Sequence, residues 1–341
     1  MILRDPSVFL ATICLLAAAA LVGGKAGPAS PDTARSARHE DLVSFFRDWR
    51  SFQKPKQVGG VSDYTAGAMA AQQTELDTFR RRLAAMDPSG WPVARQADYH
   101  VVRAELNGLD FDHRVLKPWA NNPAFYVTVF TEESDQPARE GPFALGAVEL
   151  WTYRFPLSRE SAGEIDAGIR AIPKLLAQAK VNLTGGGRDL WIYGTKSIRQ
   201  QSADLAKLAS QLTGSPGNLS ALAADVEKAR QATDDFASWL ESRSASKMGP
   251  SGVGVENYNW YLKNVQLVPY TWQEEVALME RDLARSHALL AMEEQRNAKL
   301  PQPMPVAGAE EFSRRFEAGV KEYVAFLRDR EILEIRDWME P

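Results

Sequence analysis

Residues 163–187 read GEIDAGIRAIPKLLAQAKVNLTGGG, and their apolar side chains recur at the period of a helix. The recurrence runs in steps of three and four residues, which places six side chains on one helix face: Ile165, Ile169, Ile172, Leu176, Ala179 and Leu183. Pro173 predicts a kink near the middle of this helix. The glycine triplet 185–187 predicts a C-terminal cap, because it follows a helix instead of leading from a strand into one.

The same rhythm continues in both directions along the chain. Further apolar stripes at helical spacing lie within residues 42–52, 76–86, 99–116, 198–212, 219–240, 276–290 and 312–327. Thr271 and Glu274 predict a capping box at the start of one of these helices. No convincing strand ladder interrupts them. The sequence therefore predicts an all-α fold, a multi-helix antiparallel bundle with proline-rich and aromatic-rich loops and little or no β-structure.

Two segments rich in aromatic rings break the helical rhythm, residues 117–156 and residues 255–270. Solvent does not stabilise so much ring surface, so the first segment is predicted to be an ordered loop, with or without a short helix, packed on the bundle. The rings are also candidates for the wall of a cleft, and the candidate residues are Trp119, Phe125, Tyr126, Trp151, Tyr258, Trp260 and Tyr261. The alternative is that these rings simply complete the hydrophobic core.

The N-terminus has the pattern of a secretory signal peptide. Arg4 precedes an apolar run over residues 8–22, and small residues follow it. The run is roughly 15 residues long, whereas a membrane span needs about 20. We therefore expect export to the periplasm or the extracellular space, with no membrane span after signal cleavage. An uncleaved N-terminal anchor is the alternative.

These patterns divide the chain into a signal peptide over residues 1–26, a polar linker over residues 27–38 and a helical domain over residues 39–341. The single cysteine, Cys14, lies in the signal peptide, so the mature fold must rest on its core without disulfides. The formal net charge is -4, and the basic and acidic side chains are interspersed. Such a balance gives no electrostatic footprint for nucleic acid, which we exclude as a partner.

The sequence contains no recognisable catalytic motif. The four histidines, His39, His100, His113 and His287, lack the spacing of a helical zinc pair. No Gly-x-Ser-x-Gly motif is present, and no cysteine nucleophile survives signal cleavage. Paired carboxylates such as Glu274-Glu275 are typical of solvated faces and helix starts. The sequence predicts no catalytic, cofactor-binding or metal-binding residue in this chain.

Several short motifs together resemble a known bacterial family. They are Asp87-Pro88-Ser89-Gly90-Trp91-Pro92, Arg103-Ala104-Glu105-Leu106, Asn122-Pro123-Ala124-Phe125-Tyr126, Arg139-Glu140-Gly141-Pro142 and Gln200-Gln201-Ser202-Ala203-Asp204-Leu205. Over about residues 41–341 the chain resembles the N-terminal half of domain-of-unknown-function family 885, relatives of gluzincin metallopeptidases. In that family the zinc ligands and the catalytic glutamate belong to an HE-containing motif of the C-terminal half. No residue here matches that motif, so the resemblance implies a truncated domain, with zinc implied for the full-length family alone.

Three hypotheses about function follow. In the first, the chain is the cleft-forming half of a metallopeptidase-like protein, acts on a peptide-like small substrate, is inactive by itself and needs a C-terminal half or a partner chain. This hypothesis predicts a large exposed apolar face. In the second, the chain is a self-sufficient periplasmic or envelope-associated binding protein that uses its ring-rich segments. In the third, it is a complete enzyme with a cryptic pair of carboxylates.

Overall fold

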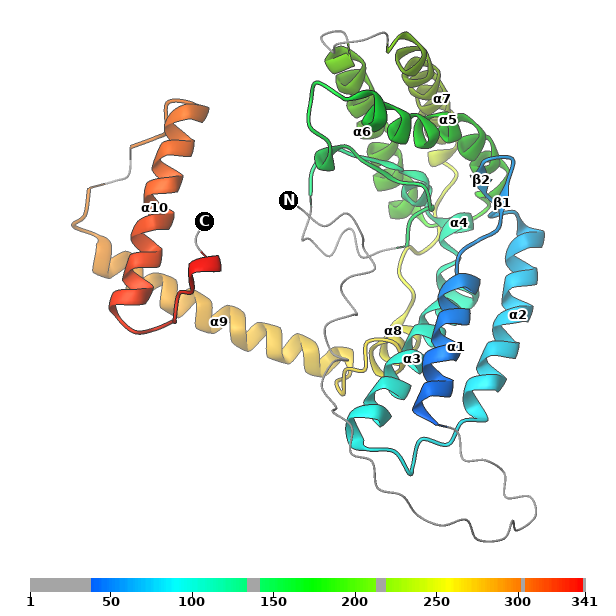
Figure 1. Cartoon of the computed structure of the whole chain (residues 1–341), viewed down its shortest axis with the longest axis horizontal. Helices are drawn as coiled ribbons and strands as arrows, with labels where there is room; N and C mark the ends of the chain where they lie inside the picture. The colour runs from blue at the N-terminus through cyan, green and yellow to red at the C-terminus, as the bar shows by residue number, and fades with distance from the viewer. Residues whose placement is uncertain (1–37, 134–141, 213–218, 302–303, 340–341) are drawn as a thin grey trace, which may run out of the picture. The chain divides into compact units, whose positions relative to one another are not determined.

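The computed structural model describes residues 38–133, 142–212, 219–301 and 304–339 (Figure 1). The predicted signal peptide, and the predicted linker up to residue 37, lie outside the described residues. The chain divides into two compact units, Met1–Pro269 and Tyr270–Pro341, here called unit 1 and unit 2. The helical domain predicted over residues 39–341 spans both units, and both described hydrophobic cores consist of side chains that precede Pro269.

The described residues are mostly helical, and the predicted all-α fold is confirmed. Unit 1 contains the helices α1 (His39–Phe52), α2 (Ala66–Ala84), α3 (Val93–Phe111), α4 (Pro118–Asn121), α5 (Arg159–Asn182), α6 (Arg188–Leu212), α7 (Ser220–Ser244) and α8 (Val255–Asn264). Unit 2 contains α9 (Trp272–Asn297), α10 (Ala309–Asp329) and the short 3-10 turn η6 (Asp337–Met339).

The described β-structure consists of two small sheets. β1 (Gln57–Val58) pairs with β2 (Val61–Ser62) in an antiparallel hairpin, and β3 (Val129–Phe130) pairs in parallel with β4 (Val148–Glu149). The second sheet lies in the ring-rich segment, which also contains the 3-10 turns η3 (Pro123–Tyr126) and η5 (Leu150–Thr152). The described part of this segment is therefore ordered and packed on the helices, as the sequence predicted.

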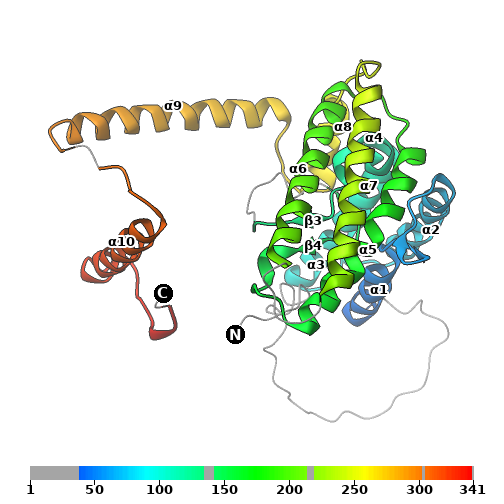
Figure 2. The same cartoon turned by 90° about the horizontal axis from the view of Figure 1, so that it is seen from above.

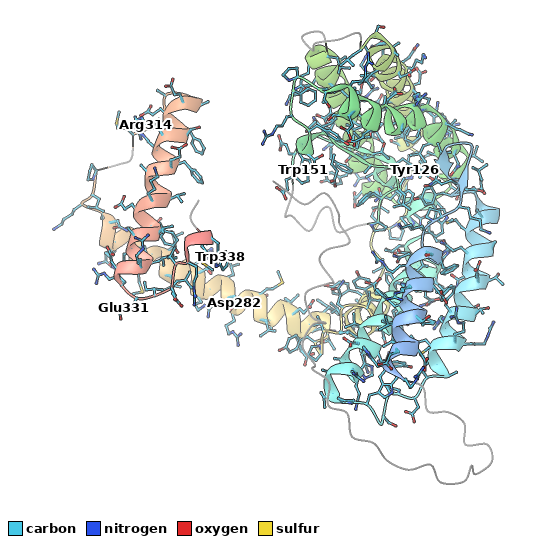
Figure 3. All side chains as sticks on the ribbon, viewed as in Figure 1. Tyr126, Trp151, Asp282, Arg314, Glu331 and Trp338 are labelled. Carbon is cyan, nitrogen blue, oxygen red and sulfur yellow. The ribbon has the colours of Figure 1, made fainter. Side chains whose placement is uncertain are left out.

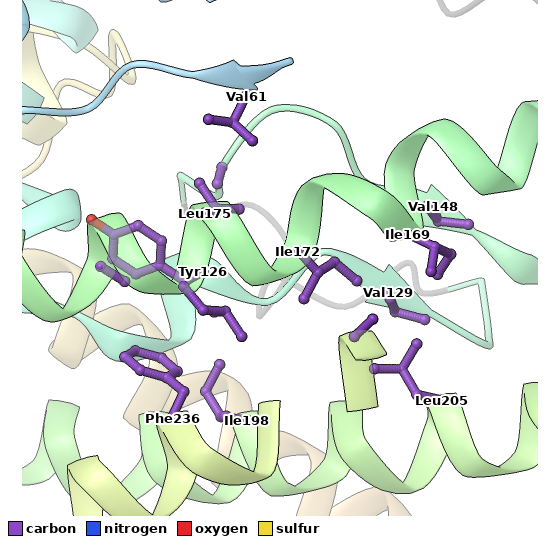
Figure 4. Close-up of a cluster of buried hydrophobic side chains, with 14 of the residues drawn as sticks. Val61, Tyr126, Val129, Val148, Ile169, Ile172, Leu175, Ile198, Leu205 and Phe236 are labelled. Carbon is purple, nitrogen blue, oxygen red and sulfur yellow. The ribbon is translucent and has the colours of Figure 1, made fainter. Parts of the chain in front are cut away.

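The larger core lies between α5, α6 and α7, which run side by side (Figure 2). All six residues of the predicted α5 stripe are buried there, which confirms the pattern read from residues 163–187. Figure 4 shows Ile169 beside Val148, and Ile169 and Ile172 of α5, Ile198 of α6 and Phe236 of α7 all belong to this core. Each of these four side chains is no more than 1% exposed, so their burial is a main source of stability.

A second, smaller core joins α1, α2 and α3. Phe79 of α2 lies at its centre, with its ring centroid 5.6 Å from that of Phe45 and 4.5 Å from that of Phe52. Trp49 is fully buried beside them. Aromatic pairs in these geometries add stabilisation beyond that of the buried area. The stripes predicted within residues 42–52 and 76–86 are therefore real helix faces.

The glycine triplet does not cap α5 as predicted. The C-cap residue is Leu183, whose dihedral angles are not left-handed. Gly185 instead allows the backbone of Asn121 to approach closely, since a Cβ on Gly185 would lie 2.8 Å from the Asn121 Cα atom. The Gly185 N–H donates a hydrogen bond of 2.9 Å to the Ala120 carbonyl. The glycine is thus needed for packing between the α5 end and α4.

In unit 2, α9 begins with the predicted capping box. The Thr271 N–H donates to the Glu274 carboxylate at 2.7 Å, and the Glu274 N–H donates to the Thr271 Oγ1 at 3.4 Å. Neither α9 nor α10 contains a buried residue. Trp338, labelled in Figure 3, is 77% exposed. Among the described residues, no helix combines the length and the apolar character needed to cross a membrane.

Candidate functional site

Helix α3 ends in a π-helical turn, η2 (Asp112–Leu116). The Lys117 N–H donates a hydrogen bond of 2.7 Å to the Asp112 carbonyl, five residues earlier. Lys117 then leaves the turn with φ at +40°, in the left-handed region that residues other than glycine rarely adopt. Single π-helical turns are rare and occur frequently at functional sites. The side chains around η2 are therefore candidates for a functional site.

Asp110, in the last turn of α3, is almost completely buried and is held by two arginines. Its carboxylate lies 3.2 Å from Nη1 of Arg80 in α2 and 2.7 Å from Nε of Arg114 in η2. Its side chain is 1% exposed, whereas both arginines reach solvent. A buried carboxylate is stable only when it is paired, so these contacts fix the position of Arg114.

Aromatic rings from α8 pack against the same turn. The Trp260 ring stacks on the ring of Phe111 with a centroid distance of 5.9 Å, and the Tyr261 ring lies 4.9 Å from Phe111. The guanidinium of Arg114 lies 5.1 Å from the centroid of the Trp260 ring, a cation–π geometry. Phe111 is buried and Trp260 is half-buried. Trp260 therefore presents part of its ring to solvent beside a positioned guanidinium.

His113 connects η2 to the first ring-rich segment. Its ring centroid lies 4.9 Å from that of Trp119, and its Nε2 lies 3.0 Å from the Gln72 side-chain oxygen. Burial lowers the pKa of His113, and the negative charge of Asp110 partly opposes that effect. A lowered pKa favours the neutral ring at pH 7, in which Nε2–H donates to Gln72.

A hollow of about 420 Å³ lies beside Asp112, between α3 and the residues that follow α8. Its polar lining includes Gln53, Glu105, Asp112 and Gln266. Burial raises the pKa of Asp112 to about 7, so its carboxyl group is partly protonated at neutral pH. The side chain can therefore either donate or accept a hydrogen bond there.

A second hollow of about 530 Å³ lies on the Arg114 side of η2. Backbone segments around Gly187 and Gly249 line much of it, together with the polar side chains of Arg114, Asn121 and Asn257. The Ser251 Oγ accepts the Asp189 N–H at 2.8 Å, which ties this loop to the start of α6. The two hollows thus differ in charge, with carboxyl groups in the first and a guanidinium in the second.

The structure brings three of the seven predicted cleft residues to η2. Trp119 contacts His113, and Trp260 and Tyr261 contact Phe111. These three residues come from both ring-rich segments, which are far apart in the sequence.

The other four predicted residues lie elsewhere. Phe125 and Tyr126 are buried in the larger core, so they complete the core and do not line a solvent-facing wall. The Tyr126 hydroxyl donates to the Trp119 carbonyl at 2.6 Å, and burial raises its pKa. Trp151 and Tyr258 are exposed, and Figure 3 labels Trp151 and Tyr126 on separate parts of unit 1.

The polar residues of this site were not predicted from the sequence. Asp110, Asp112 and Arg114 belong to a short run, Asp110-Phe111-Asp112-His113-Arg114, at the end of a predicted helix. The one feature of the sequence that could have pointed to this site was the position of His113 on an otherwise apolar helix face. A π-helical turn has no comparable sequence signal, because its extra residue is accommodated by tertiary packing.

Metal chemistry has no candidate among the residues that the structure describes. No group of three or more histidine, cysteine, aspartate or glutamate side chains there could hold a metal ion. His39 Nε2 lies 2.8 Å from the Asp98 carboxylate, and His113 contacts Gln72. The described residues therefore do not fit the zinc site that the family resemblance implies for a full-length protein.

Comparison with known proteins gives one structural likeness. No family model and no curated protein matches the chain. A solved structure from Shewanella oneidensis, described as a suspected lipoprotein of unknown function, is similar with a TM-score of 0.55 and 14% sequence identity. The similarity covers 88% of this chain and 59% of that protein, so the chain spans little more than half of its length. At this identity the likeness shows the fold alone.

Proposed function

We propose that this chain is the cleft-forming helical part of an exported, metallopeptidase-like protein, and that the η2 site binds a peptide-like substrate. The observation that carries this proposal is the meeting of Trp119, Trp260 and Tyr261 at a π-helical turn flanked by two hollows. Clefts that combine apolar rings with a few oriented polar groups are the usual form of a ligand site.

The charges of the two hollows support a peptide-like ligand. Asp112 and Glu105 suit an ammonium group or amide N–H donors, and Arg114 suits a carboxylate. The half-buried Trp260 ring offers a flat apolar surface for a side chain. A peptide with free ends carries all of these groups.

The chemical step is assigned to no residue of this chain. The described residues offer no metal site, and the family resemblance implies that the metal and its glutamate belong to another part of the protein. We accordingly propose that this chain binds and orients the substrate, and that a second protein body supplies the reaction. Export, by cleavage of residues 1–26, is part of the same proposal and would be checked by the mass of the protein recovered from the periplasm.

Peptide binding is tested with free tetrapeptides and the same peptides blocked at both ends, followed by the indole N–H signals in an NMR titration. We expect the Trp260 signal to move with the free peptides and the blocked peptides to bind about tenfold more weakly. Trp260→Leu should weaken binding about tenfold, whereas Trp151→Leu, which removes an exposed ring of η5, should not. Shifts confined to residues away from η2, or no shift at all, would refute the site.

The alternative is a self-sufficient envelope binding protein that uses the same rings. Peptide binding alone does not separate the two functions. Reading the coding DNA beyond the codon for Pro341 does, since a continuation with an HE-containing helix motif favours the metallopeptidase-like protein. Its absence, together with tight binding by this chain alone, favours the binding protein.

A further inference from the structure

A third hollow, of about 450 Å³, lies between α2 and α3 in unit 1. It shares no lining residue with the two hollows beside η2. Arg80 and Arg81 follow Asp77 by three and four residues, which places all three on one face of α2. Asn107 follows Arg103 by four residues, so these two share a face of α3. One polar helix face thus forms each wall of the hollow.

The charges that line this hollow are mostly positive. The lining contains the guanidinium groups of Arg80, Arg81 and Arg103 and the carboxylate of Asp77. All three arginines are exposed, and an excess of two positive charges remains when Asp77 is set against them. The whole chain has a net charge of -4, so this excess is local. Like charges in one hollow repel one another, and a bound anion would offset that repulsion.

Arg80 is held in place by a buried carboxylate. Its Nη1 lies 3.2 Å from the carboxylate of Asp110, which is 1% exposed, and 3.9 Å from that of Asp77. Asp110 also pairs with Arg114, which does not line this hollow, so its charge is shared between two arginines. A guanidinium has five N–H donors, and both contacts of Arg80 use Nη1. Arg80 therefore offers its Nε and Nη2 donors from a fixed position.

The other two arginines are not paired with carboxylates among the residues that the structure describes. Nη2 of Arg81 donates to the Thr78 Oγ1, a neutral acceptor, at 2.9 Å. Arg81 also lies in the last turn of α2, where the helix dipole favours a cation. Arg103 lies in the middle of α3, where the dipole gives no such stabilisation. A ligand with negative charge would explain the position of Arg103 as well as that of Arg81.

We propose that this hollow binds a phosphate group. A phosphate group carries up to two negative charges and at least three acceptor oxygens, so several guanidinium groups can share it. A carboxylate, by contrast, is saturated by the planar fork of a single arginine. Arg81 and Arg103 would supply charge from opposite walls, and Arg80 would supply oriented donors. This site goes beyond the peptide site at η2 and does not depend on it.

The test titrates the full chain with inorganic phosphate, hexyl phosphate and acetate at constant ionic strength. The signals followed by NMR are the arginine Nε–H groups and the backbone amides of residues 80–84 and 99–107. We expect both phosphates to shift the Arg103 Nε–H signal, and acetate to bind about tenfold more weakly. Tighter binding of hexyl phosphate than of inorganic phosphate would identify an organic phosphate as the ligand, and equal binding would identify free phosphate.

Arg81→Gln and Arg103→Gln should each weaken phosphate binding about tenfold, with circular dichroism unchanged. The matched control is Arg47→Gln, because Arg47 is an exposed arginine of α1 that does not line the hollow. An equal loss in Arg47→Gln would mean that phosphate responds only to the overall charge, and would overturn the proposal. Acetate binding as tight as that of phosphate, or no shift at these signals, would overturn it too. Peptide binding at Trp260 should be unchanged in Arg103→Gln, so the two sites can fail separately.

Discussion

The Asn107 side-chain amide donates a hydrogen bond of 3.0 Å to the carbonyl of Asn264, the last residue of α8. The bond joins α3 to α8 and links residues that are 157 positions apart in the sequence. Asn264 also donates to the Trp260 carbonyl at 2.9 Å. The position of the Trp260 ring therefore depends on a contact with α3.

Replacing Asn107 by alanine removes this donor. We expect Asn107→Ala to lower the free energy of unfolding by about 1 kcal/mol, because the Asn264 carbonyl loses a hydrogen bond at a partly buried place. Urea unfolding measures the change. Asn257→Ala, which removes an exposed side-chain bond to the Val253 carbonyl just before α8, should change stability by less than about 0.5 kcal/mol. Equal effects of the two variants would contradict the role of the Asn107 contact.

Asp112 predicts a characteristic dependence of stability on pH. Burial raises its pKa to about 7 in the folded chain, whereas an unfolded aspartate has a pKa of about 3.9. Between these two pKa values the Asp112 carboxyl is protonated in the folded chain and ionised in the unfolded chain. The contribution of Asp112 to the free energy of unfolding therefore falls as the pH rises from about 4 to about 7, and it is constant above that.

Asp112→Asn removes this titration. We expect the variant to gain stability relative to the wild type from pH 4 to pH 7, by at most about 4 kcal/mol, with no further gain at pH 8.5. Urea unfolding at four pH values measures the difference. A difference that does not change with pH would mean that Asp112 ionises as freely in the folded chain as in the unfolded one.

The buried carboxylate of Asp110 depends on its two arginines. We expect the double variant Arg80→Met, Arg114→Met to lose about 3 kcal/mol of stability, because it leaves a buried charge without a cation. Lys228→Met is the control. Lys228 forms an ion pair with Asp225 at the surface of α7, and this pair should contribute less than about 1 kcal/mol to the free energy of unfolding. Similar losses in the two proteins would show that the Asp110 cluster is not specially stabilising.

Gly185 and Gly186 provide a matched pair of substitutions. A Cβ at Gly185 would lie 2.8 Å from the Asn121 Cα, so Gly185→Ala should destabilise the chain by about 2 kcal/mol. At Gly186 no heavy atom lies within 4 Å of the new Cβ, and Gly186→Ala should be nearly neutral. Thermal unfolding followed by circular dichroism compares them. A neutral Gly185→Ala would mean that α4 moves aside at little cost.

Local patterns were sufficient to predict most helices. The α5 stripe, the aromatic face of α1 and the Thr271 capping box all depend on residues within a few turns of one another, and the structure confirms each. The all-α class follows from the same periodicity. Short-range spacing carries this information because a helix repeats every 3.6 residues.

Features that depend on distant residues could not be predicted in the same way. Phe125 and Trp260 both belong to ring-rich segments, yet the first lies in the core and the second in the η2 site. Nothing in their local sequence separates these outcomes, since each is decided by the helices that happen to pack beside it. The contact of Arg114 with Trp260 has the same origin.

The lack of buried side chains in α9 and α10 also has a calorimetric consequence. The heat capacity change of unfolding arises mainly from apolar surface that becomes exposed to water. The described residues of these two helices already expose much of their apolar surface in the folded chain, so they contribute little to that change. A melting endotherm would thus report on unit 1, while unit 2 loosens gradually on heating as an isolated helix does. If another molecule covered the apolar faces of α9 and α10, their association would show a negative heat capacity change.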